Sequence, residues 1–291
     1  MYGSERIDLT GDGRVFYVPY LPDRSPELPF GGRRPSVLVL PGGGLACLSA
    51  REGESVALAF AARGFNAFVL HYSLNEHASW PHPLADAMRA MRSIRAHAAE
   101  WSLDPDAIAV CGFSAGGHIA ASLAVYWNDP GLCAAAGVLP DEAKPNAVIL
   151  NYPVMSPREQ ADSGTLDRLR RGHEGDPSID DTLAVELHVG RHTPPCFIMH
   201  AYFDNGAPIA GSMVFAMALL RNGIPFELHV PQDGAHGLAL ADASTYAGGW
   251  TLNRDYARWP DLASAWMRKL FGYFPSEPEA VYPSALERMG R

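Results

Sequence analysis

The chain has 291 residues, a formal net charge of −9 and an isoelectric point of about 5.6. This acidic balance without a basic stripe argues against a nucleic-acid partner, because clustered Lys and Arg are needed to hold a phosphate backbone. Hydrophobic residues make up 47% of the chain and charged residues 19%, and no apolar run reaches the roughly 18 residues of a membrane span. We therefore predict a soluble globular protein, with residues 1–291 forming a single α/β domain.

The N-terminal residues, MYGSERIDLTGDG, do not combine a positive segment with an apolar one. This predicts a cytoplasmic protein, unless a secretion signal preceded the sequence. His188 and His192 have the i, i+4 spacing of metal ligands but no acidic partner placed as in H-E-x-x-H, so we predict no metal. Four cysteines lie far apart and indicate neither a disulfide framework nor a zinc site: Cys47, Cys111, Cys133 and Cys196.

Apolar patterning predicts an alternation of strands and helices in the first half of the chain. The run SVLVL at 36–40 is short, β-branched and apolar at most positions, as in a strand buried on both faces. From 83 to 101, apolar residues recur at three, four and seven while arginines fall on the other side, which indicates an amphipathic helix. The predicted strands are 14–20, 36–40, 65–74 and 107–114, and the predicted helices are 53–64, 83–101 and one reaching about Tyr126.

The second half continues this alternation after one interruption. Residues 155–193 are charged and poor in apolar residues, and they are longer than an ordinary connection, so we predict an inserted cap or lid. The remaining predicted strands are 146–154, 196–204 and 225–230, and the remaining helices are 208–222 and 260–272. Strands that alternate with helices in this way predict a mostly parallel sheet covered by helices on both faces.

The sequence Gly112-Phe113-Ser114-Ala115-Gly116 joins an apolar strand to a helix of small residues. This is the G-x-S-x-G context of a nucleophile elbow, in which the serine lies on a sharp turn. Glycines are expected on both sides, because a side chain there would press on the neighbouring strand or helix. We predict Ser114 as a nucleophile, although a glycine-rich turn before a helix can also serve packing alone.

A serine hydroxyl needs a general base, and the base needs a carboxylate that orients it. Asp204 ends the predicted strand 196–204, and His236 follows the last predicted strand. Taken singly, Asp204 is also explained as a turn or N-cap residue and His236 as an ordinary loop histidine. Because all three residues fall at carboxyl ends of strands in the order Ser, Asp, His, we predict a catalytic triad.

The run Pro41-Gly42-Gly43-Gly44 follows the predicted strand 36–40. Glycines let the backbone approach a developing oxyanion, which preorganised N–H groups would stabilise. We predict that the N–H groups of Gly43, Gly44 and Ala115 form an oxyanion hole. A surface turn is the plain alternative, and a phosphate loop is disfavoured because no G-K-[ST] follows.

Two aromatic features have open interpretations. Phe113 lies beside the predicted nucleophile and is a candidate for lining a substrate pocket, although packing in the core is the favoured reading. Tyr246, Trp250, Tyr256 and Trp259 follow His236 closely. They would form a flat platform on which a sugar ring could stack, with Trp250 as the candidate contact, or they pack the C-terminal part against the domain.

Together these segments resemble the α/β-hydrolase esterases of the bacterial acetyl-xylan esterase and feruloyl esterase-like group, which are akin to the hormone-sensitive-lipase-like esterases. The resemblance covers residues 35–274, and the PGGG loop in place of HGGG is a marked trait of that group. It implies an α/β-hydrolase fold with eight mostly parallel strands, no metal or organic cofactor, and hydrolysis of short acyl esters, typically acetyl groups on sugars. It rests on the blocks VLVLPGGGL, LAFAARGFNAFVLHYSL, PLADAMRAMRSIRAHAAEWSLDPDAIAVCGFSAGGH, ILNYPV, TPPCFIMHAYFDNGAP and GIPFELHVPQDGAHGL.

Residue by residue, the resemblance implies Ser114 as nucleophile, Asp204 as acid, His236 as base, and Gly43 and Gly44 as the oxyanion loop. The chain departs from the group just before the acid. Where the group has an acidic pair, this chain has a phenylalanine before the aspartate, and the Asn-Gly-Ala turn that follows is atypical. The resemblance therefore leaves the pocket shape and the acyl preference undetermined.

The sequence favours a serine carboxylesterase that deacylates a small-molecule ester, with an acetylated sugar as the expected substrate. An amide-directed hydrolase, such as an arylformamidase or a small peptidase, would keep the same triad, because this fold also hosts amide chemistry. A non-catalytic small-molecule receptor is a third reading, disfavoured because a receptor need not keep base and nucleophile together. The alcohol half of the ester and the choice between monomer and homo-oligomer stay open.

Overall fold

The structure is a computed structural model that describes residues 5–23, 33–159 and 164–272. Most of the predicted connection between the first two strands, and four residues of the predicted cap, lie outside the described residues. Within the described part of the chain, no helix has both the length and the apolar character needed to cross a bilayer.

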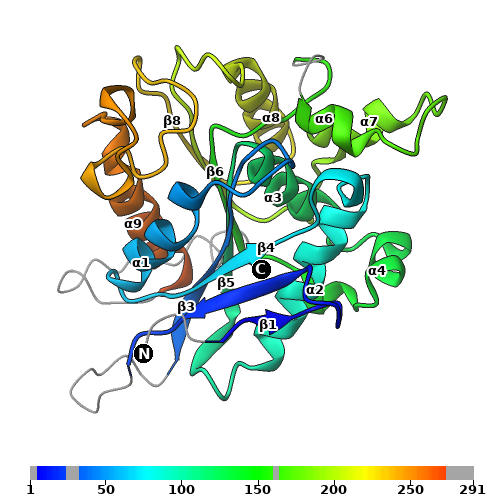
Figure 1. The fold of residues 1–291 in the computed structure, drawn as a ribbon, viewed down its shortest axis with the longest axis horizontal. Coiled ribbons are helices and arrows are strands. Elements are labelled where there is room, and N and C mark those ends of the chain that lie inside the picture. The colour runs from blue at the N-terminus through cyan, green and yellow to red at the C-terminus, as the bar shows by residue number, and fades with distance from the viewer. Residues whose placement is uncertain (1–4, 24–32, 160–163, 273–291) are drawn as a thin grey trace.

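A mixed sheet of eight strands runs through the centre of the protein (Figure 1). Its spatial order is β1-β2-β4-β3-β5-β6-β7-β8. β1 pairs antiparallel with β2, and β2 pairs antiparallel with β4. The other six strands, from β4 through β3 and β5 to β8 in this order, pair parallel with one another. The mostly parallel eight-stranded sheet is thus confirmed. The strands are β1 (Ile7–Asp8), β2 (Phe16–Tyr20), β3 (Arg34–Leu40), β4 (Asn66–His71), β5 (Leu103–Phe113), β6 (Ala147–Asn151), β7 (Cys196–Met199) and β8 (Phe226–His229).

Helices cover both faces of the sheet and enclose one apolar core on each side. Helices α1 and α9 lie on one face, and α2, α3 and α8 lie on the other (Figure 1). The helices are α1 (Glu54–Ala61), α2 (His82–Ala96), α3 (Ser114–Tyr126), α4 (Pro130–Ala136), α5 (Pro140–Ala143), α6 (Gly164–Leu169), α7 (Ile179–Leu183), α8 (Ile209–Arg221) and α9 (Trp259–Phe271). Short 3-10 turns are η1 (Ala50–Glu52), η2 (Asn75–His77), η3 (Val185–His188), η4 (Ala243–Thr245), η5 (Gly249–Thr251) and η6 (Tyr256–Arg258).

The differences from the predicted elements include two ends that come earlier and two helices that were not predicted. The helix predicted over 83–101 ends at Ala96, where the ring of His97 stacks on Trp101 and the chain turns toward β5. The strand predicted over 196–204 ends at Met199, so the following residues form a loop that hydrogen bonds to the segment after β8. Helices α4 and α5 were not predicted, because their small and polar residues give no amphipathic period.

Parallel pairing sets where the functional loops meet. In β3, β5, β6, β7 and β8 the chain runs in the same direction, so the loops that follow these strands emerge at one edge of the sheet. The predicted PGGG loop follows β3, Ser114 follows β5, and the predicted acid and base follow β7 and β8. The topology therefore brings together segments that are far apart in the sequence.

Candidate active site

Ser114 lies at the turn between β5 and α3, in a backbone conformation that side chains rarely adopt. Its φ is 50°, in the left-handed region, although it is not a glycine. Such strain persists only where the surrounding structure enforces it. The flanking glycines explain how: a Cβ on Gly116 would lie 2.1 Å from the carbonyl oxygen of Leu40, and one on Gly112 would lie 2.3 Å from that of Gly116. Strand β3, strand β5 and helix α3 thus approach too closely for a side chain at either glycine.

We expect Gly116→Ala to destabilise the protein by about 3 kcal/mol or more, because the new methyl group would overlap main-chain atoms that cannot move independently. Urea unfolding followed by circular dichroism measures this. Gly249→Ala is the matched control, because a Cβ on Gly249 meets nothing within 4 Å. A Gly116→Ala protein with the parent's unfolding midpoint would contradict the packing described for the elbow.

Ser114, His236 and Asp204 form a continuous chain of contacts. The Oγ atom of Ser114 lies 2.7 Å from Nε2 of His236, and Nδ1 of His236 lies 3.0 Å from both carboxylate oxygens of Asp204. An ionised carboxylate only accepts hydrogen bonds, so this arrangement assigns the proton of a neutral His236 to Nδ1. Nε2 is then left as an acceptor facing the serine hydroxyl.

Asp204 is held in place by its own loop and by a second histidine. Its side chain is 1% exposed, and its Oδ1 accepts hydrogen bonds of 2.8 Å from the N–H groups of Gly206 and Ala207. Nε2 of His200 lies 3.6 Å from Oδ2. Burial opposes ionisation, but the interactions with His200 and His236 outweigh it and hold the pKa of Asp204 well below its usual value. Asp204 is therefore ionised and orients His236.

The loop that the sequence marked as atypical supports the histidine directly. The Oδ1 atom of Asn205 accepts the main-chain N–H of His236 at 3.2 Å. A Cβ on Gly206 would lie 2.5 Å from Cγ of His236, so only glycine leaves room for the imidazole ring. Sequence reasoning did not assign these two residues a role. The available signal was a glycine two residues after the predicted acid.

The loop Pro41-Gly42-Gly43-Gly44 lies against Ser114, and each of its four carbonyl groups accepts a hydrogen bond from the protein. Gly43 and Gly44 have φ values of 124° and 65°, which favour glycine, and a Cβ on Gly43 would lie 2.2 Å from the carbonyl oxygen of Cys47. Among the described residues, no acceptor takes the N–H of Gly43 or Gly44. The carbonyl groups are bound by Tyr72 Oη at Pro41, Ser49 N at Gly42, Ala46 N at Gly43 and Arg168 Nη1 at Gly44.

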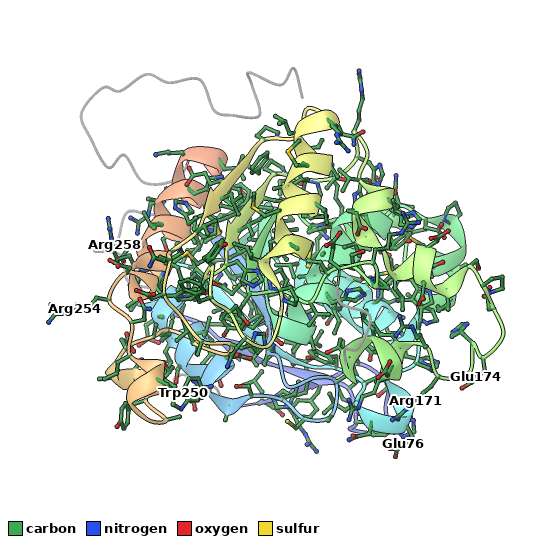
Figure 2. The ribbon with its side chains drawn as sticks, turned by 90° about the horizontal axis from the view of Figure 1, so that it is seen from above. Glu76, Arg171, Glu174, Trp250, Arg254 and Arg258 are labelled. Atoms are coloured by element: carbon green, nitrogen blue, oxygen red, sulfur yellow. The ribbon has the colours of Figure 1, made fainter. Side chains whose placement is uncertain are left out.

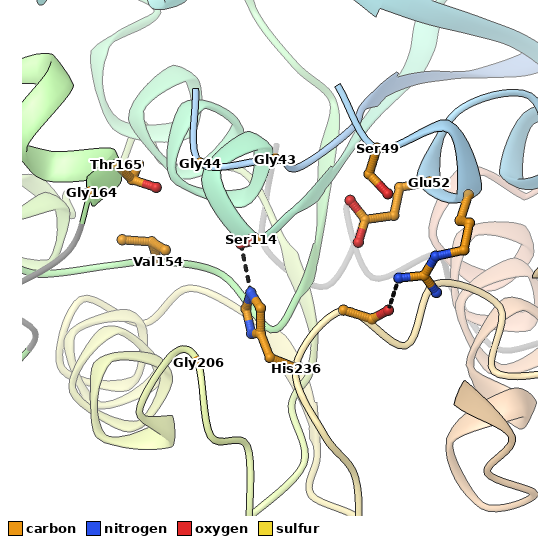
Figure 3. A pocket seen from close by; sticks show the side chains of 12 residues that line it. Gly43, Gly44, Ser49, Glu52, Ser114, Val154, Gly164, Thr165, Gly206 and His236 are labelled. Carbon is orange, nitrogen blue, oxygen red and sulfur yellow. Dashed lines mark hydrogen bonds between the residues drawn. The ribbon is translucent and has the colours of Figure 1, made fainter. Parts of the chain in front are cut away.

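A cavity of about 480 Å³ opens at Ser114 and His236. Figure 3 shows Val154 and Thr165 on one side of Ser114, with Ser49 and Glu52 on the other. The predicted oxyanion residues Gly43 and Gly44 line the cavity, and so do Gly164, Gly206, Gly237 and Arg51. The lining is thus a set of small and polar groups around the reactive pair.

The aromatic residues considered as substrate contacts do not line the cavity. Phe113 is completely buried and packs against Trp259, so it is part of the core and does not line the cavity. Tyr256 and Trp259 are also fully buried. Trp250 is half-exposed at the surface (Figure 2) and lies beside the guanidinium of Arg51, 5.3 Å from the ring centre, rather than in the cavity lining. The predicted platform is therefore divided between core and surface.

The two spaced histidines of the predicted cap contact different main-chain carbonyls. His188 Nε2 lies 2.8 Å from the oxygen of Asp181, and His192 Nε2 lies 2.8 Å from that of Val125. Across residues 5–23, 33–159 and 164–272, the structure contains no group of three or more His, Cys, Asp or Glu side chains that could hold a metal ion.

His118 is buried on α3, one turn after Ser114. Its Nδ1 lies 3.2 Å from the carbonyl oxygen of Val154 and 3.1 Å from that of Met155, so Nδ1 carries a proton and donates. Burial lowers the pKa of His118 from 6.5 to about 4, because the charged ring would lose its hydration. The ring is therefore neutral at pH 7 and joins α3 to the segment after β6.

We expect the protein to lose stability as the pH falls from 7 to 5, in part through His118. In this window the unfolded chain binds a proton at His118 and the folded chain does not, so acidification favours unfolding, by about 2 kcal/mol. Urea unfolding at both pH values measures the loss. His118→Asn retains an N–H donor for the two carbonyls and should show a smaller loss; an unchanged loss would rule out this source of acid sensitivity.

Comparison with known proteins places this geometry in a family. The BD-FAE family model matches residues 29–219, which is more than half of the chain. Endo-1,4-beta-xylanase B of Butyrivibrio fibrisolvens is 35% identical over 224 residues, covering 74% of this chain and 34% of that protein. Acetylxylan esterase of Xylanibacter ruminicola is 28% identical over 258 residues, covering 87% of this chain and 49% of the relative. The chain thus spans about a third to a half of these relatives.

A solved structure agrees with these matches. The acetyl ester-xyloside bifunctional hydrolase from Caldicellulosiruptor lactoaceticus superposes with a TM-score of 0.77 at 33% identity, covering 94% of this chain and 98% of that one. The likeness extends over nearly the full length of both chains. The chain therefore belongs to the BD-FAE family of α/β-hydrolase esterases.

Proposed function

We propose that this protein is a serine esterase that removes short acyl groups, acetyl above all, from carbohydrate esters. The observation that carries the proposal is the contact chain from Ser114 through His236 to Asp204, which opens into a cavity beside two N–H groups of the PGGG loop. A nucleophile, a base with a fixed tautomer and an oxyanion site are the parts that acyl transfer needs.

The reaction follows from these positions. Nε2 of His236 takes the proton of Ser114 as Oγ attacks the ester carbonyl carbon, and the carbonyl electrons move to its oxygen. The N–H groups of Gly43, Gly44 and Ala115 stabilise that oxyanion. Collapse breaks the bond to the alcohol, which leaves with the proton from His236. Water, deprotonated by His236, then releases the acid from the acyl-enzyme and restores Ser114.

The cavity supports a small acyl group and a polar alcohol. It is lined by Ser49, Arg51, Glu52 and Thr165 together with several glycines, rather than by a long apolar tunnel. Hydroxyl and guanidinium groups suit the hydroxyls of a sugar. Relatives called acetylxylan esterase and acetyl ester-xyloside bifunctional hydrolase add support for an acetylated carbohydrate.

We also propose that residues 155–193 act as a cap over this cavity. Gly164 and Thr165 of this segment line it, and Nη1 of Arg168 donates to the carbonyl of Gly44 in the PGGG loop. The cap would therefore limit the size of the alcohol half of the substrate. A cytoplasmic location stays a prediction.

A substrate panel tests the function. We expect acetate release from acetylated mono- and xylo-oligosaccharides and cleavage of p-nitrophenyl acetate, with kcat/KM falling for longer acyl chains. N-formyl aromatic and aminoacyl amide substrates should be cleaved far more slowly. Faster turnover of either amide class would replace the esterase by an amide hydrolase, and no turnover of any substrate would favour a receptor.

A further inference from the structure

The turn η1 places a buried carboxylate beside the candidate active site. Glu52 is 3% exposed, and its carboxylate lines the cavity near Ser114 (Figure 3). Its Oε2 accepts the N–H of Gly42 at 2.7 Å, and its Oε1 accepts the hydroxyl of Tyr152 at 2.7 Å. Burial raises the pKa of Glu52, and these two hydrogen bonds act against that rise. Both oxygens are used as acceptors, so the geometry is that of an ionised carboxylate with two dedicated donors.

Tyr152 extends this contact to the loop that carries His236. Its hydroxyl donates to Glu52 and accepts the main-chain N–H of Ala239 at 2.9 Å. Its ring lies edge-on to the imidazole of His236, with ring centres 5.1 Å apart. Tyr152 is 1% exposed, so this position is fixed by packing on all sides.

The neighbouring residue of η1 reaches the same loop by a second path. Nη2 of Arg51 donates to the carbonyl of Gly237 at 2.7 Å, and its guanidinium lies beside the ring of Trp250. The turn η1 is therefore joined to the PGGG loop at Gly42. It is also joined to the loop after β8 that carries His236, here called the histidine loop, directly at Gly237 and through Tyr152 at Ala239.

We propose that Glu52 is a positioning residue that fixes the PGGG loop and the histidine loop relative to each other. This inference rests on the proposed esterase function. By taking the N–H of Gly42, Glu52 sets the orientation of the peptides that follow, so that the N–H groups of Gly43 and Gly44 face the cavity. Through Tyr152, it holds the segment just after His236. Glu52 itself transfers no proton in the reaction.

The substitution Glu52→Gln distinguishes this role from simple packing. The glutamine would keep the shape of the side chain, but its amide NH₂ would face either the N–H of Gly42 or the hydroxyl of Tyr152. If the amide faces Tyr152, the hydroxyl hydrogen of Tyr152 loses Glu52 Oε1 as its acceptor. One buried donor would be left without a partner, and one of the two loops would shift.

We expect Glu52→Gln to lower kcat on p-nitrophenyl acetate by about 10- to 100-fold, because small displacements of positioning groups have effects of this size. KM should change by less than about threefold. Tyr152→Phe should lower kcat similarly, and the double variant should lose less than the product of the two effects, because both act through one contact. Glu54→Gln, an exposed residue two positions later, is the control that should keep parent kinetics.

A folded Glu52→Gln protein with the parent kcat would overturn the proposal. If Glu52→Gln does not fold, Tyr152→Phe decides by the rate at which a fluorophosphonate probe labels Ser114: a rate at least about tenfold slower supports the proposal, and an unchanged rate overturns it. Ser114→Ala separates the two claims. If it abolishes turnover while Glu52→Gln changes nothing, only the role of Glu52 fails; if it leaves turnover unchanged, the Ser114-based mechanism on which this inference rests fails.

Discussion

Replacing Ser114 by alanine should lower kcat on p-nitrophenyl acetate by on the order of 10⁵-fold, because no acyl-enzyme can form without its Oγ. The residual rate would come from the oxyanion site and substrate binding alone. Initial rates at saturating substrate measure the effect, with circular dichroism to confirm the fold. A Ser114→Ala protein that keeps the parent rate would show that another group performs the reaction.

A second buried serine on α3 provides the matched control. Ser122 is 1% exposed, and its Oγ has no hydrogen-bond partner in the part of the chain that the structure describes. Ser122→Ala should leave kcat within about twofold of the parent, because the residue does not line the cavity. A comparable loss in both variants would indicate a general effect on α3 instead of a missing nucleophile.

Asp204→Asn should lower kcat by about 10³- to 10⁴-fold while the fold is retained. An asparagine amide that donates to Nδ1 of His236 would place the imidazole proton on Nε2, which could then no longer accept the proton of Ser114. The same change removes the charge that stabilises the imidazolium formed during attack. The measurement is kcat on p-nitrophenyl acetate at pH 7 to 8.

Asp233→Asn is the control for this variant. Asp233 is exposed in the same loop as His236, three residues before it. Its substitution should change kcat by less than about twofold. A loss of less than about tenfold in Asp204→Asn would mean that groups other than Asp204 orient the imidazole of His236.

Much of the site's layout followed from the pattern of strands. The carboxyl ends of parallel strands share one edge of a sheet, so a serine, an aspartate and a histidine placed after three such strands were expected to meet, and the structure brings them together. The strand before Asp204 ends at Met199, earlier than predicted. This changes little, because the loop turns back toward β8 and holds Asp204 near His236.

Other features depend on contacts that no local pattern contains. Glu52 and Tyr152 are 100 residues apart and meet only because the fold brings η1 next to the residue that follows β6. In the sequence, Glu52 is one polar residue in a short turn, and nothing local indicates that Gly42 and Tyr152 donate hydrogen bonds to it. For Phe113 and Trp250, aromatic character alone does not tell which side of a strand or loop faces the substrate, so the sequence leaves both pocket lining and packing open.

The identity of the nucleophile is the central claim, and covalent labelling tests it most directly. The protein would be treated with a fluorophosphonate probe, digested, and analysed by peptide mass spectrometry. We predict one adduct per chain, on Ser114 in the peptide that contains Gly112-Phe113-Ser114-Ala115-Gly116, and no adduct in Ser114→Ala. Absence of an adduct from an enzyme that is active on esters, or an adduct on any other residue, would contradict this account.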